Sequence, residues 1–276
     1  MAEVQELLAA QDWSSQLAAL TLIRRKGYCL PEEVLRVGTA LLCKAVGHLG
    51  DEKWRVMEDV FYAALRCHAN EWMTTTLKAI KTQFGSTAKT MRMEAAVCEY
   101  TGNLQEANSI YEAIIKTSPH DQLACKRRCA LLRADGKTEL AIQELNRYLE
   151  TFQGDVEAWD ELADIYISEC HYQQAAFAYE EVLLASPQDF WVVLRYGEIV
   201  YSIGGMANLQ AARSYFAQAI LLNEACVRAM WALHQCCRQI DSLKPEAENT
   251  RMREAAEKQI RRAYSARSSL LAAYVF

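Results

Sequence analysis

A spacing of 34 residues recurs along the chain and constrains its fold more than any other feature. Small residues recur at this spacing, each followed four residues later by an aromatic residue or leucine: Ala107 with Tyr111, Ala141 with Leu145, and Ala175 with Tyr179. Predicted helix-ending positions recur at the same interval: Gly85, Pro119, Gln153 and Pro187. Residues four apart share one face of a helix, so the pattern predicts a repeated helical unit.

Each unit has room for two antiparallel helices of about 12 to 14 residues joined by short turns. The small residue lets the second helix approach the first closely, and the larger residue one turn later fills the gap to the next unit. Proline follows the second helix because it cannot continue it. Only 11 glycines and 4 prolines occur in 276 residues, which favours helices over a fold with many turns.

One unit matches the tetratricopeptide pattern closely. Its characteristic residues are Trp159, Leu162, Ala163 and Tyr166 in the first helix, and Ala175, Tyr179 and Pro187 in the second. The predicted fold is therefore all-α, a tetratricopeptide-repeat solenoid of antiparallel helix pairs that form a right-handed superhelix. A general helical bundle with chance periodicity is the alternative.

The pattern predicts three parts along the chain. Residues 1–52 form an N-terminal helical cap, and residues 226–276 form a divergent C-terminal helix pair and cap. The repeat array occupies 53–225, with units at about 53–86, 87–120, 121–154, 155–188 and 189–225. In the last unit Ala212 and Phe216 take the packing positions, and Ala212 follows Ala175 by 37 residues. Three residues are thus inserted, near Gly204 and Gly205.

Charge and composition argue against several classes of function. The chain has 30 basic and 35 acidic residues, a net charge of -5, so we expect no nucleic-acid binding. No signal-peptide core is evident, and no apolar run is long enough to span a bilayer. The ten cysteines include no C-x-x-C pair, so we expect no metal and no cofactor. The phosphate-binding, hydrolase and metalloprotease motifs are missing, so we expect no enzyme.

A partner surface is expected on the first helices of the units, which line the concave face of such an array. The groove is predicted to be basic in the repeats at 87–120 and 121–154, acidic at 155–188 and aromatic at 189–225. Leu194 and Glu198 are also expected on its open face. Mixed charge suits a protein segment, and aromatic residues are the expected hot spots. The candidate residues are Lys89, Arg92, Lys126, Arg127, Arg128, Arg133, Glu157, Asp160, Asp164, Trp191 and Tyr201. An ordinary solvated face is the alternative reading.

A clamp for chaperone tails would place Lys and Asn four residues apart on a first helix. This chain instead has Arg92 with Ala96, and Lys126 with Ala130. A chaperone-tail adaptor is therefore disfavoured, although a general adaptor for chaperone or degradation machinery stays open as a second hypothesis.

The stretch from Ala141 to Asn223 resembles a particular family. The segments AIQELNRYLETFQGDVEAWDELADIYI and YQQAAFAYEEVLLASPQ, and the run after Gly204-Gly205, are similar to subunit 2 of the endoplasmic reticulum membrane protein complex. The inserted Gly-Gly turn is the most telling part, and the resemblance extends from about residue 51 to 264.

The resemblance implies a role that periodicity alone does not show. Such a complex inserts tail-anchored and multi-spanning proteins into the endoplasmic reticulum membrane without nucleotide hydrolysis, and subunit 2 is its peripheral cytosolic scaffold. The implied partners are membrane-embedded and soluble subunits of the same complex, with client membrane proteins reached indirectly. By the same analogy, the basic cluster Lys126, Arg127 and Arg128 is expected to contact partners or clients.

Overall fold

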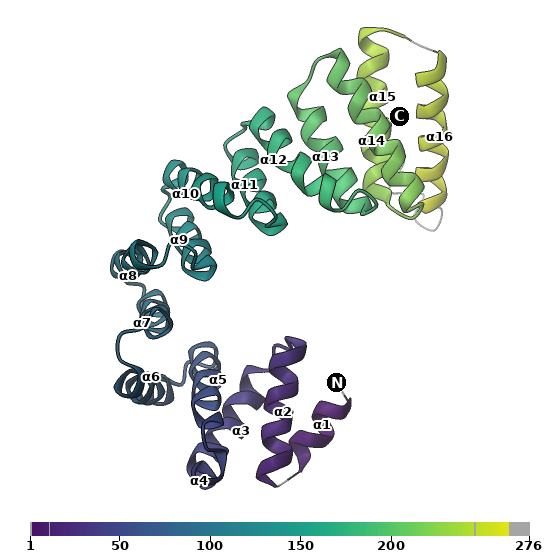
Figure 1. Cartoon of the computed structure of the whole chain (residues 1–276). Helices are drawn as coiled ribbons and strands as arrows, with labels where there is room; N and C mark the ends of the chain where they lie inside the picture. The colour runs from purple at the N-terminus through teal and green to yellow at the C-terminus, as the bar shows by residue number, and fades with distance from the viewer. Residues whose placement is uncertain (1, 11, 246, 265–276) are drawn as a thin grey trace. The chain divides into compact units, whose positions relative to one another are not determined.

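The structure is a computed structural model that describes residues 2–10, 12–245 and 247–264. These residues form sixteen α-helices joined by short turns, with no strand among them. The predicted all-α tetratricopeptide class is confirmed. Two compact units follow each other along the chain, Met1–Gly136 and Lys137–Phe276 (Figure 1). Residues 265–276 of the predicted C-terminal cap lie outside the described residues, and the division into cap, array and terminal pair stays a prediction.

The first unit packs its helices mainly against their neighbours in sequence. Helix α5 packs on both α3 and α6, and α7 packs on α8, which also contacts α9. The bounds are α1 (Ala2–Ala9), α2 (Trp13–Lys26), α3 (Pro31–Lys44), α4 (Val46–Leu49), α5 (Glu52–Arg66), α6 (Asn70–Phe84), α7 (Ala88–Tyr100), α8 (Leu104–Thr117) and α9 (Gln122–Ala134).

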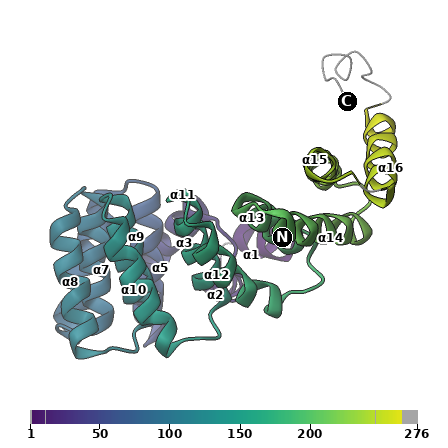
Figure 2. The same ribbon diagram turned by 90° about the horizontal axis from the view of Figure 1, so that it is seen from above.

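The second unit shows the same pairing. Its most extensive contacts join α13 to α14, α11 to α12, and α15 to α16, and Figure 2 shows α13 and α14 from above. The bounds are α10 (Thr138–Thr151), α11 (Val156–Ser168), α12 (Tyr172–Ala185), α13 (Phe190–Ile203), α14 (Met206–Leu222), α15 (Val227–Leu243) and α16 (Ala247–Ala263).

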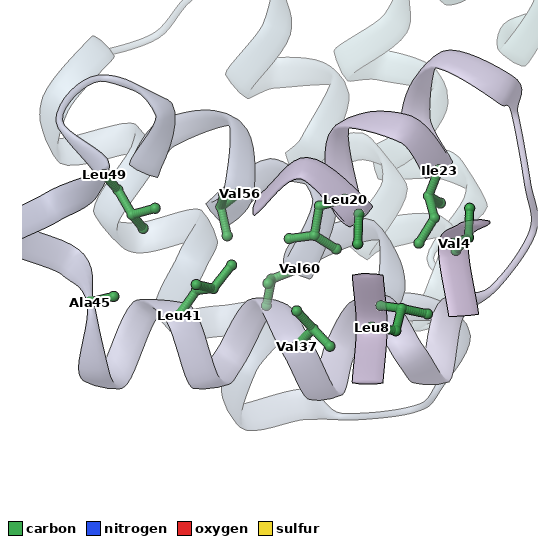
Figure 3. Close-up of a cluster of buried hydrophobic side chains, with 11 residues drawn as sticks. Val4, Leu8, Leu20, Ile23, Val37, Leu41, Ala45, Leu49, Val56 and Val60 are labelled. Atoms are coloured by element: carbon green, nitrogen blue, oxygen red, sulfur yellow. The ribbon is translucent and has the colours of Figure 1, made fainter. Parts of the chain in front are cut away.

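The N-terminal helices share one apolar core with the start of the array. Figure 3 shows side chains from α1 to α5 directed toward one another, including Val4, Leu20, Leu41 and Val60. Each of these four is at most 1% exposed. Burial of this kind contributes about 1.5 to 3 kcal/mol per large apolar side chain, so these helices are packed onto α5.

The turn after each first helix repeats in backbone conformation as well as in spacing. Residues in the left-handed region occur every 34 positions: His68 (φ 58°), Gly102 (φ 80°), Gly136 (φ 74°), Cys170 (φ 60°) and Gly204 (φ 76°). A left-handed residue after a helix satisfies its last carbonyl groups and reverses the chain. The turn is therefore kept even where glycine, the residue best suited to it, is replaced.

The start of each first helix is also repeated. Thr87, Asp121, Asp155 and Asp189 stand 34 residues apart, and each accepts a backbone N–H bond at the start of its helix. Such caps contribute about 1 kcal/mol each. The inserted residues break this register, so α15 begins after Cys226 rather than after Asn223.

The residues predicted to pack the repeats are mostly in the core. Ten of them are 0% to 6% exposed: Ala107, Tyr111, Ala141, Leu145, Leu162, Ala163, Ala175, Tyr179, Ala212 and Phe216. Trp159 and Tyr166 are half-buried instead. Trp159 donates its indole N–H to the Gln153 carbonyl at 2.9 Å, and the Tyr166 hydroxyl accepts from Asn146 at 3.4 Å. Their polar atoms thus keep them at the margin of the core.

Candidate partner-binding surface

Three of the basic candidates of the first unit are paired with carboxylates of neighbouring repeats. The Lys89 ammonium lies 2.5 Å from Glu58 Oε2, and Arg92 pairs with Asp121, the residue that caps α9. Arg127 pairs with Glu99, which also accepts the Tyr111 hydroxyl at 2.7 Å. These pairs join α5 to α7, and α7 to α9 or its cap. The charges predicted for a partner therefore already bridge successive first helices.

The second unit carries equivalent pairs. Asp164 of α11 lies 3.1 Å from an Arg195 nitrogen of α13. Glu198 of α13 receives two hydrogen bonds from Arg228 of α15, at 2.6 and 2.7 Å, and this pairing raises the pKa of the Arg228 guanidinium. First helices of successive units lie side by side, so charges about one repeat apart in sequence meet in space.

The other charged candidates occupy the same helices. Lys126 and Arg128 are half-buried, and Arg128 Nε donates to Asn108 Oδ1 at 3.3 Å. Arg133 and Glu157 are exposed. The pKa of Asp160 is raised, first by partial burial and second by the nearby Asp164 carboxylate.

The two aromatic candidates, both on α13, differ from each other. Trp191 is 53% exposed and lies against Phe190, with ring centroids 4.9 Å apart. Tyr201 is half-buried, and burial raises its pKa. The expectation that Leu194 lies on the open face is wrong, because it is 1% exposed. Helix α13 packs against α12, α14 and α15, which leaves it few open positions.

A groove of the first unit with a volume of about 700 Å³ lies along α5, α7 and α9. Its apolar lining includes Tyr62 and Leu123, which are 41% and 61% exposed, together with Leu65 and Tyr100. We call this surface the main groove. Arg66, Arg92, Arg127, Glu58 and Glu99 provide its charged lining. An apolar floor with charged edges is the usual construction of a site for a protein segment.

Reasoning from the sequence predicted some of these residues and missed others. Arg92 and Arg127 were predicted, whereas Tyr62, Leu123 and Arg66 were not. A signal for the charge pairs does exist in the sequence, because Glu58 and Lys89 carry opposite charges 31 residues apart. The sequence carries no such signal for the groove, because α5, α7 and α9 belong to three different repeats.

The structure offers no centre for metal chemistry in the residues that it describes. No group of three or more His, Cys, Asp or Glu side chains there is arranged to hold a metal ion. Within the same ranges, no helix has both the length and the apolar character needed to cross a bilayer.

Comparison with known proteins places the chain in a family. The family description "EMC2 TPR-like repeat domain" matches residues 73–218. ER membrane protein complex subunit 2-A of Xenopus laevis is 34% identical over 96% of this chain and 90% of its own length. Subunit 2 of Xenopus tropicalis is 34% identical over 91% of this chain and 86% of its own length.

A solved structure supports the fold independently. The C-terminal part of a TPR repeat-containing protein from Cytophaga hutchinsonii aligns with a TM-score of 0.58 at 13% identity. The alignment covers 99% of this chain and 98% of that protein. At this identity the likeness concerns the fold alone, whereas the relatives above share sequence along most of their length. The chain belongs to the family of ER membrane protein complex subunit 2, whose members are built from tetratricopeptide-like repeats.

Proposed function

We propose that this chain is a non-catalytic scaffold subunit of the ER membrane protein complex. It works at the cytoplasmic side of the membrane as a peripheral component, bound to the membrane-embedded and soluble subunits of that complex. In this role it supports the insertion of tail-anchored and multi-spanning proteins without nucleotide hydrolysis. Family membership supports the assignment, and the clients are reached through the other subunits.

The main groove is the observation that carries this proposal. Leu123 is 61% exposed and Tyr62 is 41% exposed, and both line this groove, whose volume is about 700 Å³. An apolar lining with aromatic and aliphatic residues inside a polar rim is typical of a surface that binds another protein. The pairs Arg92 with Asp121 and Arg127 with Glu99 hold neighbouring helices in register beside it. The surface is thus built to bind rather than to react.

A general adaptor for chaperone or degradation machinery is the second candidate. The structure gives it less support, because Arg92 is engaged by Asp121 and Ala96 lines the main groove where a clamp would need a polar amide. Peptides that carry chaperone C-terminal tails are therefore expected not to bind the purified chain. Saturable binding of such a tail would favour the adaptor.

Affinity purification from detergent extracts tests the scaffold proposal. The tagged chain is expected to recover multi-spanning membrane subunits, and Leu123→Asp is expected to recover fewer because a charge replaces an apolar contact in the groove. Leu243→Asp is the matched control, since Leu243 is equally exposed at 61% but lies on α15. Recovery of only soluble partners by the unaltered chain contradicts the proposal.

A further inference from the structure

Arg66 stands where two grooves of the first unit meet. It lies at the end of α5 and lines the main groove together with Tyr62. Both residues also line a second groove of about 390 Å³, formed by α2, α3 and α5. The apolar lining of this second groove includes Leu20, Leu30 and Val34. Apolar surface therefore lies on both sides of one guanidinium group.

The other arginines that line these grooves already have a carboxylate partner. In the second groove, Arg24 Nε lies 3.1 Å from Asp59 Oδ1, and this hydrogen bond raises the pKa of Arg24. In the main groove, Arg92 pairs with Asp121 and Arg127 pairs with Glu99. Each of these charges is balanced within the chain.

Arg66 differs from them. Its Nη1 donates to the Cys29 thiol sulfur at 2.8 Å, and no carboxylate of the described residues lies within ion-pair distance of it. The Cys29 sulfur is a weak hydrogen-bond acceptor and does not replace a carboxylate partner. The guanidinium presents a planar fork of donors that fits a carboxylate, so this charge is available to a ligand.

An alternative reading treats Arg66 as an ordinary solvated arginine. A lone surface arginine next to charged neighbours would need no further explanation, because exposed charges are stable in water. Here, however, apolar residues of both grooves adjoin Arg66, among them the 41%-exposed ring of Tyr62, and the other arginines of the grooves are already paired. Partner segments gain affinity from apolar contacts and register from a charge, and this arrangement supplies both.

We propose that the two grooves bind one extended protein segment in which a carboxylate side chain lies between apolar side chains. The carboxylate pairs with Arg66, while the flanking apolar side chains occupy the main groove beside Leu123 and the second groove beside Leu30. The inference rests on the proposed function only in taking the main groove as a partner-binding surface. It adds the chemistry that the partner segment carries and the residue that sets its register.

Peptide display on the purified full chain tests this assignment. The library holds random peptides of about 12 residues, which span at most about 40 Å when extended. Peptides enriched on the unaltered chain are expected to contain Asp or Glu with apolar residues on both sides. With Arg66→Gln, the preference for the acid is expected to disappear while the apolar preference stays. Individual peptides should lose about tenfold or more in affinity, the usual effect of removing a charged hydrogen-bond donor.

Two controls make the result specific. Arg147→Gln removes an exposed arginine of α10, outside both grooves, and should leave the enriched sequences unchanged. Vesicles of phosphatidylserine test whether Arg66 instead serves a lipid headgroup, and they should bind the unaltered chain and Arg66→Gln equally.

Several outcomes would overturn the assignment. They are no enrichment of any peptide, enrichment without an acid, an acid preference that persists in Arg66→Gln, or vesicle binding that depends on Arg66. None of these outcomes bears on whether the tagged chain recovers membrane subunits, so the scaffold proposal is tested separately.

Discussion

Gly197 shows how a single residue sets the distance between two helices. It lies inside α13, where glycine costs about 1 kcal/mol relative to alanine in helix propensity. A Cβ atom at this position would lie 2.8 Å from Cε1 of the Phe216 ring on α14. Real Cβ atoms do not approach a ring carbon so closely, and the Phe216 ring is 1% exposed and has little room to move.

Gly197→Ala is therefore expected to lower the free energy of unfolding by about 1 to 3 kcal/mol, the usual cost of overpacking. Chemical denaturation followed by circular dichroism measures the change. Gly154→Ala is the control, because nothing lies within 4 Å of a Cβ there, and it should have little effect. Equal stability of both variants would show that α13 and α14 can separate at no cost.

At Cys170 a substitution is expected to increase the free energy of unfolding rather than lower it. It adopts φ 60° at a turn position where three other repeats have glycine, and its exposed side chain accepts a hydrogen bond from the Tyr172 hydroxyl at 3.7 Å. A non-glycine residue in the left-handed region costs about 1 to 2 kcal/mol. Cys170→Gly should therefore raise the free energy of unfolding by up to about 1 kcal/mol, measured by the same denaturation. A loss of stability would mean that the thiol makes a contact worth more than the strain.

At the scale of elements, α16 is attached by a buried polar side chain as well as by an apolar face. Its buried residues are Asn249, Ala256 and Ile260. The Asn249 side chain is 0% exposed, and its amide donates to the Cys237 carbonyl at 2.7 Å and to Asp241 at 2.6 Å. It also accepts from Arg213 at 3.1 Å, so it links α14, α15 and α16.

Asn249→Ala is expected to loosen α16 specifically, since it leaves buried groups without their partner at a cost of about 1 to 3 kcal/mol. Hydrogen exchange should show faster exchange in residues 247–263 while α11 and α12 keep their protection. Asn146→Ala serves as the comparison, because that side chain is exposed. Unchanged protection of α16 would assign its docking to Ala256 and Ile260 instead.

The elements were largely predictable from the sequence, and the groove was not. Pairs such as Ala107 with Tyr111 repeat because every repeat makes the same contact between its two helices. The periodic residues are therefore the buried ones. The left-handed turn residues and the aspartate caps follow the same period for the same reason. The groove depends on Tyr62 and Leu123, which belong to different units and obey no period. That these two side chains line one groove is known only once the packing of α5, α7 and α9 is known.

At the scale of the whole molecule, several of the charges predicted to face a partner are paired with opposite charges of neighbouring repeats. Glu58 and Lys89, for example, form an ion pair between two repeats. Exposed pairs of this kind contribute about 0 to 1 kcal/mol each, so their main effect is to hold successive first helices in register. The apolar lining of the grooves and the charge of Arg66 are open to a partner.

The central claim is that this surface supports membrane insertion by holding the membrane-embedded subunits of a complex. The most direct test measures insertion of a tail-anchored client into ER membranes from cells that lack this chain. Insertion without nucleotide should fall in these membranes, recover when the unaltered chain is expressed, and stay low with Leu123→Asp. Unimpaired insertion in the absence of the chain would contradict the claim.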